Sequence, residues 1–190
     1  MATYCSVLFY LFIPELYSPI PVRTIPYFIG AIVLTTFLVP FISIVFLKLS
    51  RRITSLEVTN REERIFPFLS IFLFYAITTY MFHAQLHVLN VFVSIMVIIT
   101  SLILIVTIIS FRFKISVHST ATWGVAGIFS AINMTTSQAG NLLWVLAVIL
   151  FIAGITTSSR LYLGRHTPTE SWFGIILGFV FCFLGYYWFI

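Results

Sequence analysis

The sequence contains no aspartate and little charge of either sign. Charged residues make up 8% of the chain, and all five acidic residues are glutamates. A soluble globular protein carries far more polar surface than this, so the composition excludes that class. Hydrophobic residues make up 61% of the 190 residues, and the mean hydropathy is +1.11. The chain is therefore predicted to be an integral membrane protein.

Cysteines and free-standing basic segments are also scarce. The two cysteines, Cys5 and Cys182, lie far apart in apolar stretches, which argues against a disulfide framework and indicates packing residues. A formal net charge of +5 favours anionic partners such as lipid head groups or a phosphorylated substrate. No basic run stands apart from the apolar segments, so nucleic acid is not an expected partner.

The apolar stretches predict an all-α fold, a polytopic helical membrane bundle. At about 20 apolar residues per spanning helix, the chain has room for about six transmembrane helices and no separate soluble domain. Residues 1–24 form an apolar, proline-rich segment without the features of a typical signal peptide. This segment is either interfacial or the end of an incomplete first helix. Residues 25–190 form one membrane domain, with predicted spans at residues 25–49, 66–86, 88–111, 121–133, 141–158 and 171–190.

Three polar loops between these spans, together with Lys48 at the end of the first span, hold nine of the ten lysine and arginine residues. Two spans separate each loop from the next, so all three loops emerge on the same face of the membrane. This face carries cations, two histidines, a hydroxyl group and a carboxylate: Arg61, Arg64, Lys114, Ser116, His118, Arg160, His166 and Glu170. Such a set suits a phosphate, because arginine binds phosphate oxygens with two parallel hydrogen bonds.

Two histidines supply the chemistry that a phosphate ester needs. One histidine can attack phosphorus while the second protonates the leaving oxygen. A carboxylate behind the attacking histidine fixes its tautomer and raises its basicity. Glu170 is the candidate for this carboxylate, because the chain lacks aspartate and its other glutamates stand at positions 15, 57, 62 and 63.

The stretch from Ser159 to Glu170 resembles a known signature. Ser159 and Arg160, five residues, His166, three residues and Glu170 are similar to S-R-x5-H-x3-D, the third signature of the type 2 phosphatidic acid phosphatase superfamily. That superfamily includes lipid phosphate phosphatases and vanadium haloperoxidase-like proteins.

Two further stretches resemble the other signatures of this superfamily. Residues 115–118, I-S-V-H, are similar to the second signature, P-S-G-H. Residues 60–64, N-R-E-E-R, together with Pro67, stand where the first signature, K-x6-R-P, belongs. The order of the three stretches and their placement on one face match the family across roughly residues 25–190.

The resemblance implies a role for each of these residues. His166 would be the nucleophile that forms a phosphohistidine, Glu170 would orient it, and His118 would be the general acid for the leaving group. The phosphoryl oxygens would be held by Arg160, Ser116 and one or both of Arg61 and Arg64. No metal or cofactor is implied, because the cations supply the electrostatic stabilisation. The implied substrate is a phosphomonoester or pyrophosphate of a lipid, such as phosphatidate, phosphatidylglycerophosphate, a polyprenyl pyrophosphate or a lipid A type.

The chain departs from the family pattern in each signature. Glu170 replaces aspartate and adds one methylene to the orienting side chain. Ile115 and Val117 replace the proline and glycine of the second signature, and glycine there would permit a close approach of the backbone to phosphate. Glu57 stands where the first signature has lysine. We predict that Lys114 substitutes, because residues 114, 116 and 118 of an extended segment point to one side.

Other functions remain as alternatives. A catalytically degraded member of the same scaffold would bind lipid phosphate without turnover, and the altered first and second signatures favour it. An ion channel or transporter is a weaker alternative, because outside this face no ionisable residue lies in mid-span to line a path. His83 and His87 have the spacing of a metal-binding pair but are predicted to be an interfacial polar pair. Gly174 and Gly178 form a helix-packing motif, used within the protein or in a homo-oligomer.

Two arguments place the charged face on different sides of the membrane. The excess of basic residues there favours the cytoplasm by the positive-inside tendency. The resemblance favours the outer side of a bacterial cytoplasmic membrane, so that the active site would face the periplasm. We adopt the periplasmic orientation as the prediction.

Overall fold

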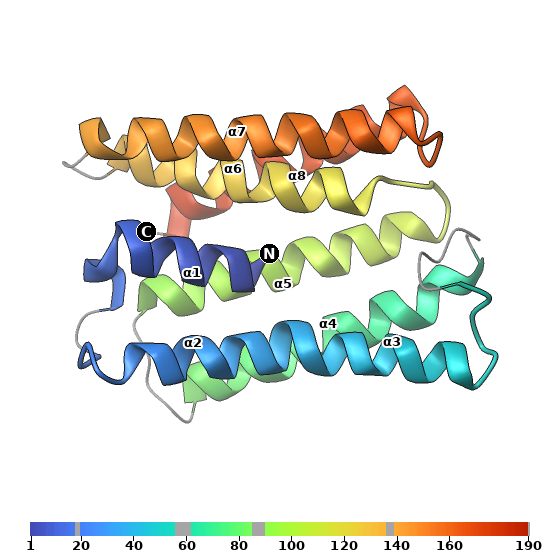
Figure 1. The fold of residues 1–190 in the computed structure, drawn as a ribbon, viewed down its shortest axis with the longest axis horizontal. Coiled ribbons are helices and arrows are strands. Elements are labelled where there is room, and N and C mark those ends of the chain that lie inside the picture. The colour runs from blue at the N-terminus through green and yellow to red at the C-terminus, as the bar shows by residue number, and fades with distance from the viewer. Residues whose placement is uncertain (18–19, 56–61, 85–89, 136–138, 190) are drawn as a thin grey trace. The chain divides into compact units, whose positions relative to one another are not determined.

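The computed structural model describes residues 1–17, 20–55, 62–84, 90–135 and 139–189. Over these residues it is helical and contains no strand, which confirms the predicted all-α class (Figure 1). The chain divides into two compact units, Ala2–Arg112 and Phe113–Ile190, the second with Met1. The predicted boundary at residue 24 separates an N-terminal segment from the membrane domain. The division into compact units does not test this boundary, which stays a prediction.

The first unit contains the N-terminal helices. Its described elements are α1 (Ala2–Phe12), η1 (Pro14–Tyr17), α2 (Ile25–Val33), the π-helical η2 (Leu34–Leu38), α3 (Val39–Leu49), η3 (Glu62–Arg64), α4 (Ile65–Ala84) and α5 (Asn90–Ser110). The elements α2, η2 and α3 follow one another without a break and form one apolar helix, Ile25–Leu49, as predicted. The π-turn ends two residues before Pro40, whose missing N–H interrupts α-helical hydrogen bonding.

Aromatic rings form the core of the first unit near the C-terminal end of α4. The ring of Phe28 lies 4.9 Å from that of Phe82 and 5.1 Å from that of Phe92, measured between centroids. The hydroxyl of Tyr17 donates a hydrogen bond to the carbonyl of Ser6 at 2.7 Å. These contacts join α1, η1, α2, α4 and α5 in one apolar core.

Both cysteines are free and buried. Burial raises the pKa of the Cys5 thiol to about 12, which keeps it in the unreactive thiol form. The prediction that the cysteines are packing residues is confirmed.

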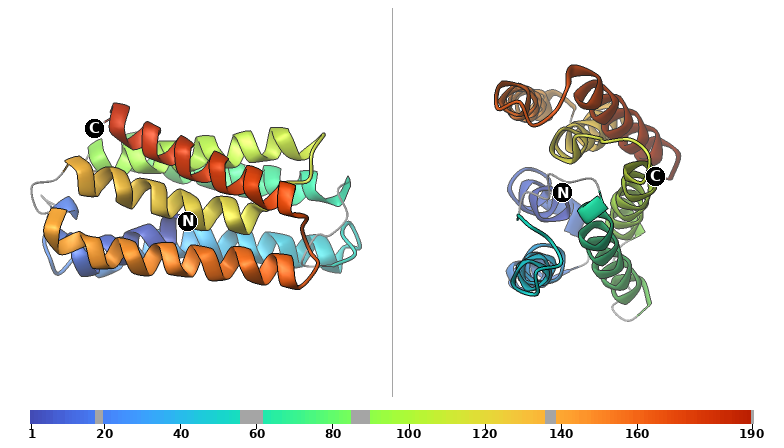
Figure 2. Two further views of the ribbon diagram at one scale, coloured as in Figure 1. Left: turned by 90° about the horizontal axis from the view of Figure 1, so that it is seen from above. Right: turned by 90° about the vertical axis from the view of Figure 1, so that its right-hand side faces the viewer.

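The second unit consists of α6 (Val117–Thr135), α7 (Ala139–Tyr162) and α8 (Pro168–Phe189). α6 packs against both other helices and most extensively against α8 (Figure 2). A Cβ atom on Gly174 would lie 2.9 Å from the Ser116 carbonyl oxygen, and one on Gly178 would collide with the Thr120 carbonyl. Glycine therefore permits the close approach of α6 and α8, and the predicted packing motif acts within the protein.

Among the described residues, five helices are long and apolar enough to cross a membrane: Ile25–Leu49, Ile65–Ala84, Val91–Ser110, Leu142–Tyr162 and Pro168–Phe189. They match five of the six predicted spans. The remaining one, residues 121–133, lies in α6, which is not among the five. α6 is richer in polar residues, and most of its residues from Gly124 to Ile132 are buried, so it needs little lipid-facing apolar surface.

Three predicted helix boundaries were wrong near the charged residues. α7 continues to Tyr162 and α8 begins at Pro168, so Arg160 and Glu170 lie in helices and not in a loop. α6 begins at Val117, four residues earlier than predicted. For α7 and α8 a capping arrangement at the helix end, described below, extends the helix into the polar stretch.

Candidate active site

A glycine turn at the end of α7 redirects the chain toward the candidate site. Gly164 has a φ of +63°, a conformation that glycine adopts without steric cost. The N–H of Gly164 donates to the carbonyl of Leu161 at 3.0 Å, and the N–H of Arg165 donates to the carbonyl of Arg160 at 3.1 Å. These two bonds form a Schellman motif, which satisfies the last carbonyls of α7. The helix therefore stops just before His166.

The beginning of α8 is a capping box. The N–H of Glu170 donates to the hydroxyl of Thr167, and the N–H of Thr167 donates to Oε2 of Glu170, both at 3.3 Å. Pro168 stands at the first helical position, where no N–H is needed. Sequence reasoning missed this arrangement, although the T-P-T-E pattern at residues 167–170 is its usual signal.

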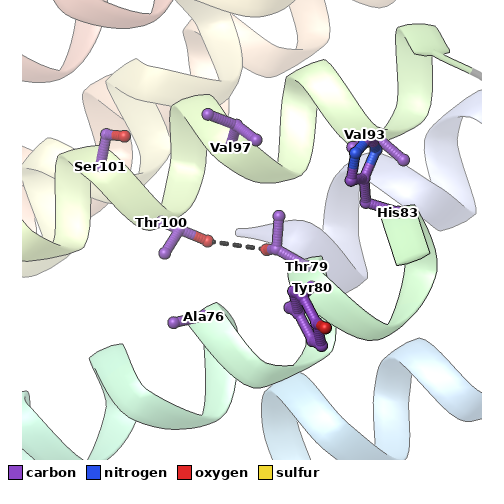
Figure 3. A pocket seen from close by; sticks show the side chains of 8 residues that line it. All are labelled: Ala76, Thr79, Tyr80, His83, Val93, Val97, Thr100 and Ser101. Atoms are coloured by element: carbon purple, nitrogen blue, oxygen red, sulfur yellow. Dashed lines mark hydrogen bonds between the residues drawn. The ribbon is translucent and has the colours of Figure 1, made fainter. Parts of the chain in front are cut away.

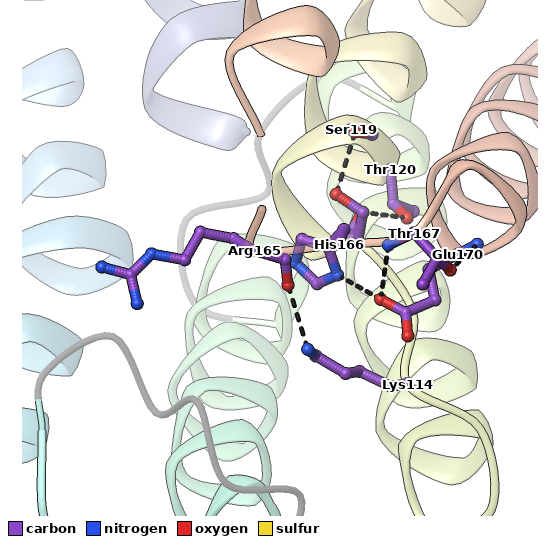
Figure 4. A network of polar contacts seen from close by, with 8 residues as sticks. Lys114, Ser119, Thr120, Arg165, His166, Thr167 and Glu170 are labelled. Atoms are coloured by element: carbon purple, nitrogen blue, oxygen red, sulfur yellow. Dashed lines mark hydrogen bonds and ion pairs between the residues drawn. The ribbon is translucent and has the colours of Figure 1, made fainter. Parts of the chain in front are cut away.

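His166 and Glu170 are in direct contact. Nδ1 of His166 lies 2.8 Å from Oε2 of Glu170, and the two side chains are 8% and 15% exposed (Figure 4). An ionised carboxylate only accepts hydrogen bonds, so the proton of a neutral imidazole lies on Nδ1 and the lone pair lies on Nε2. The contact that the motif spacing predicted is therefore present, although glutamate replaces aspartate.

The longer glutamate side chain explains how this contact is kept. From the third position of α8, one carboxylate oxygen of Glu170 reaches both the backbone N–H of Thr167 and the ring of His166. The extra methylene is thus used to combine a helix cap with the orientation of the histidine.

Two hydrogen bonds join the second signature to the third. The N–H of Ser116 donates to the carbonyl of Glu170 at 3.3 Å. Nζ of Lys114 donates to the carbonyl of Arg165 at 2.9 Å (Figure 4). Residues more than 50 positions apart thereby meet at the connection that carries His166. Nζ has three donors, so the predicted contact of Lys114 with phosphate stays a prediction.

The predicted alternation of residues 114, 116 and 118 was wrong. Lys114 is half-buried, Ser116 is fully buried and His118 is exposed. The helix begins at Val117, so His118 lies in the first turn of α6, where the two-residue period of an extended segment no longer applies. His118 is still only two residues from Ser116.

Arg160 and the net charge make the second unit attractive to an anion. Arg160 is half-buried in the last turns of α7. Its guanidinium makes no hydrogen bond or ion pair within the described part of the chain. The residues from 113 onward contain three cations and a single carboxylate, Glu170, which favours anion binding. Of these cations, Arg165 is exposed, and its guanidinium points away from His166 (Figure 4).

The residues of the predicted first signature belong to the first unit. Arg64 is the last residue of η3, is 5% exposed and directly precedes α4. Within that unit α4 packs against α5 as a hairpin, so Arg64 and Arg112 lie at the same end of it. Arg61, also predicted to bind phosphate, lies outside the described residues.

A cavity of about 400 Å³ lies elsewhere in the first unit, between α4 and α5 (Figure 3). Its lining is mostly apolar and consists of Ala76, Thr79, Tyr80, His83, Val93, Val97, Thr100 and Ser101. His83 thus borders this cavity, whereas His87 lies outside the described residues. Over the described ranges no group of three His, Cys, Asp or Glu side chains gathers to hold a metal.

Sequence reasoning also missed a group of buried polar residues behind Ser116. The hydroxyl of Ser119 lies 2.9 Å from that of Ser116, and Thr157 of α7 lies within hydrogen-bond distance of Ser119. No local sequence pattern predicts these contacts, because Ser119 and Thr157 are 38 residues apart.

Comparison with known proteins agrees with this geometry. Residues 106–190 match the profile of the PAP2 superfamily. The matched region contains α6, α7 and α8 with the second and third signatures, and the stretch compared with the first signature lies outside it. Comparisons with curated proteins and with solved structures gave no match. Residues 106–190 are therefore similar to the PAP2 superfamily, a superfamily of phosphatases.

Proposed function

We propose that the protein is a membrane-embedded lipid phosphatase that acts through a phosphohistidine on His166. The family supports phosphoester hydrolysis. The observation that carries the proposal is the 2.8 Å contact between Nδ1 of His166 and Oε2 of Glu170. This contact leaves Nε2 as the nucleophilic nitrogen. A lipid substrate is favoured because the site lies at the ends of apolar helices in a chain with hardly any soluble part.

In the first step, Nε2 of His166 attacks phosphorus. A P–N bond forms while the P–O bond to the leaving group breaks, and His118 transfers a proton to the leaving oxygen. His118 suits this role because it is exposed and can exchange protons with water. The hydroxyl of Ser116 and the guanidinium of Arg160 stabilise the charge on the phosphoryl oxygens.

In the second step, water attacks the phosphohistidine. His118 accepts a proton from this water, the P–N bond breaks, and inorganic phosphate leaves. Glu170 keeps the Nδ1 proton of His166 throughout and stabilises the positive charge of the phosphorylated ring. The substrate is a phosphomonoester or pyrophosphate of a lipid.

A lipid-phosphate-binding protein without turnover is the second candidate. It is favoured by the second signature, where Ile115 is buried and Val117 begins α6 in place of proline and glycine. A side chain at position 117 restricts how closely a phosphoryl group can approach the backbone.

The test is phosphate release by the purified protein in detergent with EDTA present. The substrates are phosphatidic acid, phosphatidylglycerophosphate and a polyprenyl pyrophosphate. We expect release by the wild type from at least one of them, and none from His166→Ala. The matched control is His83→Ala, which removes an exposed histidine of the first unit and leaves release unchanged.

Each other outcome contradicts part of the proposal. Release that persists in His166→Ala contradicts the phosphohistidine. Release that EDTA abolishes contradicts a metal-independent reaction. No release from any lipid by a folded sample favours the binding protein.

A further inference from the structure

A chain of mostly buried hydrogen bonds runs from Trp123 of α6 through Thr157 of α7 back to Ser119 of α6, and ends at Ser116. Nε1 of Trp123 lies 3.1 Å from Oγ1 of Thr157. Oγ1 of Thr157 lies 3.3 Å from Oγ of Ser119, which lies 2.9 Å from Oγ of Ser116. Figure 4 shows the last of these contacts beside Ser119. The side chain of Ser116, a residue of the second signature, is therefore at the end of a row of hydrogen bonds formed by three other side chains.

The chemistry of the members gives the first two bonds of this chain a direction. The indole N–H of Trp123 can only donate, so the oxygen of Thr157 accepts from it. Thr157 donates its own proton toward Ser119 and shares it with the carbonyl of Ala153 at 3.0 Å. Ser119 accepts this bond, and the hydroxyls of Ser119 and Ser116, 2.9 Å apart, can form their hydrogen bond in either direction.

One of these two directions makes Ser116 a donor toward the site. When Ser119 donates to Ser116, the proton of Ser116 is left to donate to another group. A buried donor without an acceptor is unfavourable, and Ser116 is fully buried. A phosphoryl oxygen carries negative charge and only accepts hydrogen bonds.

Ser116 also lies where a donor is useful. Its backbone N–H binds the carbonyl of Glu170, the residue that contacts His166. A donor held in advance needs no reorganisation when charge develops on the phosphoryl oxygens. Hydrogen-bonded hydroxyls also polarise one another, which strengthens the last donor of the chain.

We propose that Trp123, Thr157 and Ser119 are positioning residues that fix the Ser116 hydroxyl as a hydrogen-bond donor to the phosphoryl group. The inference rests on the proposed function for the identity of the ligand. It assigns no contact with substrate to the three positioning residues themselves.

The test is a double-mutant cycle between Thr157 and Ser116. Thr157→Val removes the hydroxyl at nearly constant volume, and Thr157→Ser restores it. The matched control is Thr156→Val, because Thr156 makes the same hydrogen bond to a carbonyl four residues earlier but is not part of the chain. We measure kcat/KM for phosphate release, the inhibition constant of inorganic phosphate and the melting temperature.

We expect Thr157→Val to lower kcat/KM roughly tenfold, the size of one hydrogen bond to a charged group, and to weaken inhibition by phosphate. Thr157→Ser restores both values, and Thr156→Val leaves both unchanged. In the Ser116→Ala background, Thr157→Val has no further effect, because its partner in the chain is already lost. Trp123→Phe has a smaller effect of the same sign.

The inference is overturned if Thr157→Val lowers kcat/KM equally in the wild-type and Ser116→Ala backgrounds. It is also overturned if Thr156→Val lowers kcat/KM as much as Thr157→Val does. If the wild type releases no phosphate, the proposed function fails separately. The cycle is then measured by direct binding of inorganic phosphate. Weaker binding in Thr157→Val only when Ser116 is present supports the inference, whereas absence of phosphate binding overturns it.

Discussion

Oε2 of Glu170 lies 2.8 Å from Nδ1 of His166 and also accepts the backbone N–H of Thr167. One carboxylate oxygen therefore orients the proposed nucleophile and caps the helix that follows it. Stability and activity are coupled at this position, and a substitution that keeps one role while removing the other separates them.

Glu170→Gln keeps the capping box, because glutamine also serves at the third helical position, but removes the negative charge from His166. We expect a melting temperature close to that of the wild type. The value of kcat should fall by roughly 10²–10⁴-fold, because the amide neither stabilises the charged ring nor holds its tautomer. Steady-state kinetics and thermal unfolding in the same detergent check this prediction. An unchanged kcat would show that Glu170 acts only as a cap.

Gly164→Ala tests the turn that brings His166 out of α7. No atom lies within 4 Å of a Cβ at this position, but the φ of +63° is unfavourable for alanine. We expect a loss of about 1 kcal/mol in the free energy of unfolding, together with lower activity from a displaced His166. The matched control is Gly154→Ala in the same helix, where a Cβ also meets nothing. Alanine there should stabilise by about 0.5–1 kcal/mol. Destabilisation by the control alone would contradict the argument.

Gly178→Ala tests the close packing of α6 and α8. The new methyl group would collide with the Thr120 carbonyl, and we expect a loss of about 1–3 kcal/mol in the free energy of unfolding. Denaturant unfolding in detergent measures it. Gly30→Ala is the control, because a Cβ there has no atom within 4 Å. Equal stability of the two variants would mean that α8 shifts without cost.

Labelling of two positions at opposite ends of α8 tests the proposed periplasmic orientation. Thr169 and Trp188 are exposed, and the native cysteines are buried. In intact bacterial cells we expect a membrane-impermeant maleimide to react with Thr169→Cys, and with Trp188→Cys only after the membrane is permeabilised. The reverse pattern would place the site in the cytoplasm, as the positive-inside tendency predicts.

The sequence by itself determined the membrane class and the pairing of His166 with Glu170. Long apolar stretches need helices to satisfy their backbone groups in lipid, so hydropathy located five helices and predicted Ile25–Leu49 to the residue. The pairing is local, because Glu170 follows His166 by only four positions and the helix cap at Thr167 lies between them.

Only the tertiary structure decided where α6 begins and what surrounds Ser116. The N–H of Ser116 bonds to Glu170, and its hydroxyl bonds to Ser119 and through it to Thr157. These contacts depend on helices that glycines allow to pack closely. Polar contacts between residues 38 or more positions apart have no period or motif in the sequence. They arise only when packing buries the hydroxyl groups and each must find a partner.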